Sequence, residues 1–185
     1  MGAVMISKSV AVMGVLTLLS VGAHAGSAPK ELYGKSIIVD WTAHRSQRPL
    51  GQGNFRDVNI PLSHKFYFGT TGRLFNRLSS TSKGYEAAHE VVGTSGTSPG
   101  GGPRQIQFSG RTIVLTFTNG DLAHRITIEF NEGFTTCEAQ IVSAKPAGAN
   151  VGVMTRNLYG EQIEVRSASV TGVSCSVRDG NVFAQ

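Results

Sequence analysis

The chain has 185 residues, of which 40% are hydrophobic, and a formal net charge of +5. This length is enough for one domain with a hydrophobic core, and no segment after the N-terminal apolar run is apolar enough to cross a bilayer. The basic excess favours anionic surfaces such as acidic glycans, lipid headgroups or nucleic acid, although an ordinary soluble basic surface is the simpler explanation.

The first 25 residues have the layout of a secretory signal peptide. Lys8 supplies a positive start, Val10–Val21 an apolar run, and residues 23–25 a small-x-small end. The apolar run is shorter than the ~20 residues of a comfortable membrane span. We therefore predict cleavage after Ala25, a mature single domain over Gly26–Gln185, and a periplasmic or secreted location. A retained N-terminal anchor is the alternative.

The first predicted strand is Ser36–Ala43, in which Ile37, Val39 and Trp41 share one face. The single tryptophan is interpreted as a core anchor. The Gly-x-Trp motif of the lipocalin family's first strand is absent, because Gly34 lies seven residues before Trp41. No family is recognised.

A loop over His44–Asn54 and a short edge strand over Phe55–Ile60, ended by Pro61, are expected next. His64–Leu78 then predicts a hairpin that turns at Thr71-Gly72. With that turn, one face would carry Phe66, Phe68 and Phe75, and the other Tyr67, Leu74 and Leu78. Aromatic groups on both faces indicate a sheet that is covered on both sides or curled around an interior.

Ser79–Pro103 is rich in Ser, Thr, Gly and Pro and predicts a long mobile loop, with one or two helical turns at Tyr85–Val92. Such an insertion is either a lid or binding loop, or a tolerated extension.

Arg111–Phe130 carries the clearest signal in the chain. Ile113, Leu115 and Phe117 alternate with polar residues, and after Asn119-Gly120 the alternation resumes at Ile126. Asn-Gly between two such runs predicts a β-hairpin. A two-residue turn at Asn119-Gly120 would place Ile113 opposite Ile126, whereas a loop over residues 119–122 would place Leu115 there. Either register keeps the apolar side chains on one face.

Cys137 and Cys175 are the two cysteines. Each alternates in phase with apolar neighbours, so both are expected to point inward from strands, and an oxidising compartment would favour a disulfide between them. The alternative, a metal or nucleophile site, would need suitably spaced partners, and none lies near either cysteine. Strands are also expected at Gln105–Phe108, Phe134–Val142, Glu161–Ser169, Val170–Arg178 and Asn181–Phe183, with a loop at Lys145–Gly160.

The fold class predicted is therefore all-β, with about nine or ten short strands at hairpin spacing. We expect a single antiparallel meander closed into a small barrel of lipocalin-like architecture, because closure removes exposed edges and explains strands that are apolar on both faces. A two-sheet sandwich is the alternative.

No catalytic, metal or cofactor motif emerges. Ser80–Lys83 matches Ser-x-x-Lys, but the companion motifs of that chemistry are absent from the sequence. The histidines lack ligand spacing. Glu129, Glu132 and Glu138 give no convincing glycosidase pair. We therefore expect no cofactor, no metal and no nucleic-acid partner, and we leave a hydrolase built from sequence-remote His, Glu and Ser residues as the least favoured hypothesis.

The leading hypothesis is a monomeric, exported, non-catalytic barrel that binds a small apolar or amphipathic ligand, or an anionic glycan or lipid of the envelope. The second is an interaction or inhibitor module that presents Ser79–Pro103. His124 falls by parity on the apolar face of its hairpin, where a barrel-mouth or core histidine is favoured over a metal ligand. The candidate ligand-binding residues are Trp41, Tyr67, Phe68, Arg73, Phe75, Arg77 and His124.

Overall fold

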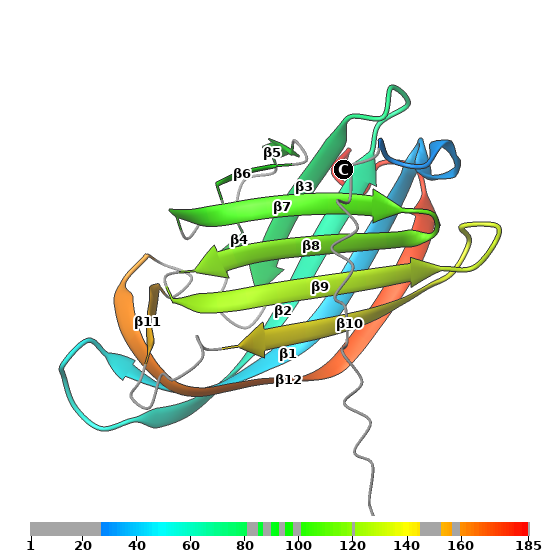
Figure 1. Ribbon diagram of the computed structural model, residues 1–185. Coiled ribbons are helices and arrows are strands. Elements are labelled where there is room, and N and C mark those ends of the chain that lie inside the picture. Colours follow the sequence, from blue (N-terminus) through cyan, green and yellow to red (C-terminus); the bar gives the residue numbers. More distant parts are fainter. Residues whose placement is uncertain are drawn as a thin grey trace, which may run out of the picture.

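The computed structural model describes residues 27–80, 85–86, 90–92, 95–97, 101–119, 121–144, 153–156 and 160–184 (Figure 1). This part of the chain is all-β, apart from one short 3-10 helix at Lys30–Leu32. No helix in it is long and apolar enough to cross a membrane. The predicted signal peptide lies outside the described residues.

The strands form two antiparallel sheets. Sheet A has the order β11-β12-β1-β2-β3-β4, with β5 also paired to β3, and sheet B has the order β10-β9-β8-β7-β6. The strands of sheet A are β1 (Lys35–Pro49), β2 (Arg56–Phe68), β3 (Leu74–Ser80), β4 (Tyr85–Glu86), β5 (Glu90–Val92), β11 (Val153–Arg156) and β12 (Gln162–Asp179). Those of sheet B are β6 (Ser95–Thr97), β7 (Gly101–Ser109), β8 (Thr112–Asn119), β9 (Leu122–Phe130) and β10 (Cys137–Ala144).

The two sheets pack face to face as a sandwich, so the predicted closed barrel is wrong and the alternative is correct. A barrel would need one continuous ladder of backbone hydrogen bonds. Among the described strands, no ladder joins sheet A to sheet B. The strands of sheet B instead cross those of sheet A (Figure 1). Within sheet A, the first and last strands are neighbours, and Lys35 lies opposite Asp179.

The core lies between the sheets and follows from the alternation within each strand. Sheet A contributes one side chain in two from β1 and β2, and sheet B does the same from β8 and β9. Fully burying an aliphatic or aromatic side chain of this size stabilises a fold by roughly 1.5–3 kcal/mol. The residues that form this core include Ile37, Val39, Trp41, Leu62, Phe66, Phe68, Ile113, Leu115, Ile126, Ile128 and Phe130.

The hairpin predicted over Arg111–Phe130 is present as β8 and β9. Leu115 lies opposite Ile126, and Asn119 opposite Leu122, which leaves residues 120 and 121 between the strands. This is the second of the two predicted registers. The apolar side chains share the inner face, as expected.

The predicted loop over His44–Asn54 is wrong in its first half, because β1 continues through Pro49. The residues after Ala43 are mostly polar, which is typical of a loop, but their backbone pairs with β2 and β12. Strand β2 also runs through Pro61 instead of ending there. β3 pairs only with Ser63–Phe68, so Pro61 lies where β2 has a paired neighbour on one side, a position that proline tolerates.

The hairpin predicted over His64–Leu78 is present, but the predicted faces are wrong. Phe68 lies opposite Leu74, so the connection has five residues, 69–73, and a turn at Thr71-Gly72 alone would give a different register. A shift of one residue moves a side chain to the other face. Consequently Phe66, Phe68, Leu74 and Leu78 face the core, whereas Tyr67 and Phe75 pair on the outer face, with ring centroids 6.1 Å apart.

The expected loop over Ser79–Pro103 contains extended structure. Its first two residues belong to β3, its last three to β7, and β4, β5 and β6 lie between. The described part of Tyr85–Val92 is strand and not helix. The remaining residues of that loop, and most of Lys145–Gly160, lie outside the described residues. The two strands predicted over Glu161–Arg178 form one, β12, and Asn181–Phe183 is not a strand.

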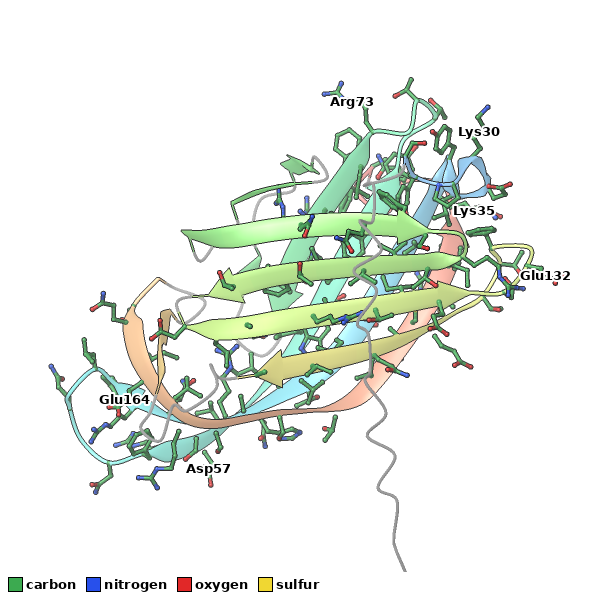
Figure 2. All side chains as sticks on the ribbon, in the orientation of Figure 1. Lys30, Lys35, Asp57, Arg73, Glu132 and Glu164 are labelled. Carbon is green, nitrogen blue, oxygen red and sulfur yellow. A yellow bond between two sulfur atoms is a disulfide. The ribbon has the colours of Figure 1, made fainter. Side chains whose placement is uncertain are left out.

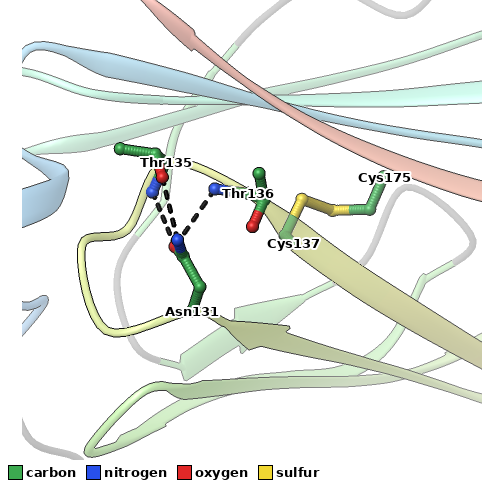
Figure 3. Close-up of a disulfide and its surroundings, with 5 residues drawn as sticks. All are labelled: Asn131, Thr135, Thr136, Cys137 and Cys175. Carbon is green, nitrogen blue, oxygen red and sulfur yellow. Dashed lines mark hydrogen bonds between the residues drawn. A yellow bond between two sulfur atoms is a disulfide. The ribbon is translucent and has the colours of Figure 1, made fainter.

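The predicted disulfide joins Cys137 to Cys175 and has a Cα–Cα distance of 5.5 Å. Both residues pack against the core. The bond connects β10 to β12, where no ladder joins the sheets (Figure 3). The loop before Cys137 is organised by Asn131, whose Oδ1 accepts hydrogen bonds from the backbone N–H groups of Thr135 and Thr136 at 2.8 and 3.1 Å.

Candidate ligand site between the sheets

One row of side chains crosses the inner face of sheet B near the β8–β9 turn. Its cross-strand neighbours are, in order, Arg104, Phe117, His124 and Ser143. The imidazole of His124 stacks on Phe117 with ring centroids 4.7 Å apart, and its Nδ1 lies 2.9 Å from Ser143 Oγ. The row therefore sets an imidazole between an aromatic ring and a hydroxyl at one end of the apolar interior.

Arg45 faces the same space from sheet A. On β1 it continues the alternation of Trp41 and Ala43, and it lies opposite Val58 of β2. Arg45 and His124 both line a partly enclosed cavity of about 70 Å³. Apart from these two and Ser143, the side chains that line the cavity are apolar.

A larger and more open pocket, of about 550 Å³, lies on the opposite, outer face of sheet B. Phe117 and His124 border both spaces, and sheet B separates the two. The outer pocket is also lined by Arg104 and Arg125, and by Ala123 and Ala144. We call the smaller cavity, lined by Arg45 and His124, the inter-sheet site, and the larger space the outer pocket.

The electrostatics of the inter-sheet site are dominated by Arg45. Burial lowers the pKa of Arg45 from its ordinary value, yet a guanidinium stays charged in proteins. Burial, and secondly the positive charge of Arg45, lower the pKa of His124 to about 4. At neutral pH the site therefore holds one cation and one uncharged imidazole.

Among the described residues, no carboxylate forms an ion pair with Arg45. The ion pair between described side chains joins Arg48 to Glu164, at 2.7 Å, and not Arg45. In the described part of the chain, none of the residues lining the cavity or the outer pocket is acidic. A partly buried cation of this kind costs free energy unless an anion reaches it.

The predicted ligand residues divide into those at the inter-sheet site and those away from it. Trp41 and His124 line the cavity. Phe68 is 1% exposed and belongs to the core. Tyr67 and Phe75 lie on the outer face of sheet A.

The two predicted arginines are also remote from the site. Arg73 lies in the β2–β3 connection, at the end of the molecule that carries Lys30 and Lys35, opposite the end marked by Asp57 (Figure 2). Arg77 is paired with Lys65 across β2 and β3, and its guanidinium lies 5.1 Å from the ring centroid of Phe183. The structure therefore brings together two of the seven predicted residues.

Arg45 and Ser143 were missed as site residues. Because β1 was expected to end at Ala43, Arg45 was assigned to a loop. The signal that could have found it is the alternation itself, since extending the period by one more step places Arg45 on the face of Trp41 and Ala43. Ser143 would have followed in the same way from Cys137, Ala139 and Ile141 on β10.

A second basic and aromatic cluster lies at the β1–β2 connection. The guanidinium groups of Arg48 and Arg166 lie 4.6 and 4.1 Å from the ring centroid of Phe55. Because Arg48 also pairs with the buried Glu164, this cluster is already satisfied by the protein's own groups. It stabilises the connection without needing a ligand.

On the outer face of sheet A, His44 forms hydrogen bonds on both ring nitrogens. Nδ1 lies 2.7 Å from Asn59 Oδ1, and Nε2 lies 2.6 Å from Thr171 Oγ1. These contacts tie β1 to β2 and β12 in an exposed position. They do not enclose a reacting group.

Neither metal ligands nor relatives define a function for the inter-sheet site. Within the described residues, no three His, Cys, Asp or Glu side chains are placed to hold a metal ion. Comparisons of the chain with protein-family models, with curated proteins and with solved structures found no match.

Proposed function

We propose that this protein is an exported binding protein that holds a small amphipathic molecule in the outer pocket. One observation carries the proposal: an open pocket of about 550 Å³ on the outer face of sheet B is lined by the apolar Ala123, Val142 and Ala144 beside polar and basic side chains. Ligand pockets in proteins typically have volumes of about 300–1,000 Å³ and mostly apolar walls with a few polar groups. The outer pocket falls in that range.

Export is supported by two features. Residues 1–25 have the composition of a signal peptide, and the Cys137–Cys175 disulfide is compatible with an oxidising compartment. Periplasmic or extracellular capture of a small molecule fits both.

A hydrolase is the alternative that a specific observation favours, because Ser143 and His124 form a hydroxyl–imidazole pair. An effective general base has a pKa near the working pH. The pKa of His124 is about 4, and the charge of Arg45 opposes protonation of the imidazole, so this pair is a poor base at neutral pH. The electrostatics favour binding over acyl transfer.

The test uses the neutral fluorophore N-phenyl-1-naphthylamine and mature protein with its disulfide formed. We expect saturable binding, and a loss of affinity of at least about tenfold in Ala123→Trp, because indole would fill the outer pocket. Ala184→Trp, at the exposed C-terminal tail, is the matched control and should bind as the wild type does. Native mass spectrometry of the purified protein would identify any ligand retained from the cell.

Equal binding by Ala123→Trp and wild type, or no saturable binding by either, would overturn the proposal. Labelling of Ser143 by a fluorophosphonate, abolished in Ser143→Ala, would favour the hydrolase instead.

A further inference from the structure

We propose that the inter-sheet site binds a small monovalent oxyanion without an apolar tail, of the size of formate, through the guanidinium of Arg45 and the imidazole of His124. The inter-sheet site lies on the inner face of sheet B, whereas the outer pocket lies on the other face. This inference therefore goes beyond the proposed function and does not rest on it.

Arg45 supplies the charge of the site. A guanidinium presents five N–H donors in a planar fork that matches the oxygens of a planar oxyanion. In the described part of the chain, Arg45 has neither an ion pair nor a hydrogen bond that would use these donors. Its side chain is partly buried and lines the cavity from the inner face of β1. An anion in the cavity would offset the free-energy cost of this unpaired charge.

His124 can supply a second donor to the same anion. Its Nδ1 lies 2.9 Å from the Ser143 hydroxyl, whereas Nε2 has no hydrogen-bond partner among the described residues. When the hydroxyl donates to Nδ1, Nε2 carries the proton and can donate a hydrogen bond to an oxyanion. No acidic side chain lines this cavity within the described residues, so none there would repel an anion.

The volume of the cavity sets the size of the ligand. One water occupies about 30 Å³ of liquid, so a cavity of about 70 Å³ has room for a molecule about twice as large as a water. Formate, the smallest carboxylate, fits this space, whereas an alkyl chain does not.

The walls of the cavity favour a single negative charge. Most of the other lining side chains are apolar, among them Trp41, Leu62 and Ile126. A multiply charged anion such as sulfate would lose its hydration against these side chains without enough donors to replace it. A monovalent anion needs fewer donors, and Arg45 and His124 can supply them.

The experiment compares formate with pivalate, two carboxylates of equal charge at neutral pH, of which only formate is small enough for the cavity. Each sodium salt is titrated at matched concentration, and so at matched ionic strength, into mature protein with its disulfide formed. Binding is measured from the NMR chemical shift of His124 Nε2 and from the free energy of urea unfolding, which rises when an anion binds only the folded protein. We expect saturable binding of formate, and an affinity for pivalate at least about tenfold lower because its methyl groups would overfill the cavity.

Arg45→Met should lower the affinity for formate at least about tenfold, the factor of one charge-assisted hydrogen bond. This variant is expected to fold, since an apolar residue replaces an unpaired, partly buried charge. Arg45→Lys keeps the charge but not the planar fork, so it should bind formate with an intermediate affinity. Arg111→Met is the matched control, because Arg111 is exposed at the other end of β8 and its loss changes the net charge equally. It should bind formate as the wild type does.

The outcomes separate this site from the outer pocket. No saturable response to formate in either measurement would overturn the anion site. Equal affinities for formate and pivalate would also overturn it, since the carboxylate would then bind on an open surface. Equal losses in Arg45→Met and Arg111→Met would show a general charge effect instead, and sulfate that binds as tightly as formate would overturn the monovalent class. None of these results would alter the binding of the neutral fluorophore or its loss in Ala123→Trp, which test the proposed function.

Discussion

The Oγ atom of Ser143 lies 2.9 Å from Nδ1 of His124, and this contact joins β10 to β9 inside the sandwich. The imidazole is uncharged at neutral pH, because burial and the nearby Arg45 lower its pKa to about 4. A hydrogen bond between neutral groups therefore lies beside an unpaired cation.

The lowered pKa of His124 predicts a pH dependence of stability. The unfolded chain takes up this proton near pH 6.5, whereas the folded protein takes it up near pH 4, so the free energy of unfolding decreases as the pH falls through that interval. Between pH 7 and pH 5 we expect the wild type to lose roughly 2 kcal/mol more than His124→Gln, measured by urea unfolding. An NMR titration of the ring should show a higher pKa in Arg45→Gln, because the repelling charge is gone. Equal losses in wild type and His124→Gln would contradict the assignment.

Removal of the disulfide should cost much of the stability of the fold. The bond closes a loop with a sequence separation of 38 residues and joins two sheets that share no ladder in the described strands. We expect the Cys137→Ser, Cys175→Ser double variant to lose about 3–4 kcal/mol in urea unfolding. The same loss should appear in the wild type under reducing conditions, and the double variant should then be insensitive to reductant.

Gly72 allows a close contact that no other residue would permit. It has φ of +80°, and a Cβ added there would lie 2.5 Å from the Tyr33 hydroxyl oxygen. We expect Gly72→Ala to lower the free energy of unfolding by roughly 1–3 kcal/mol more than Gly53→Ala. Gly53 is the matched control, because its φ is +63° and no atom lies within 4 Å of its added Cβ. Equal effects of the two changes would show that the backbone conformation alone matters.

The side chain of Asn131 should contribute more to the free energy of unfolding than its exposed position suggests. Besides accepting two backbone hydrogen bonds, it donates from Nδ2 to Thr135 Oγ1 at 2.9 Å (Figure 3). The loop that it organises holds Phe134 at φ 51°, an uncommon conformation for a bulky residue. We expect Asn131→Ala to cost roughly 1–2 kcal/mol in thermal unfolding, and Asn131→Asp, which keeps the acceptor oxygen, to cost less. A smaller loss in Asn131→Ala than in Asn131→Asp would contradict this role.

The features that could be predicted from the sequence are local ones. The period of two over Ile113–Phe117 and Ile126–Phe130 sets the apolar face of the β8–β9 hairpin without reference to the rest of the chain. The inward phase of Cys137 and Cys175 follows from the same rule. Which cysteines pair could be predicted because the sequence contains no others.

The features that could not be predicted depend on register or on distant partners. One residue more or less in the connection after Phe68 reverses the face of Phe75, and the turn residues do not determine that count. Whether sheet edges close into a barrel depends on pairings between strands far apart in sequence. Arg45 was missed because the polar residues around it are typical of a loop, although its backbone belongs to β1.

The pairing of β1 with β12 places a requirement on the timing of folding. β1 cannot complete its pairing until β12 has been synthesised, because Lys35 lies opposite Asp179, far along the chain. Contacts between residues so distant in sequence slow folding, because a long loop must close before they form.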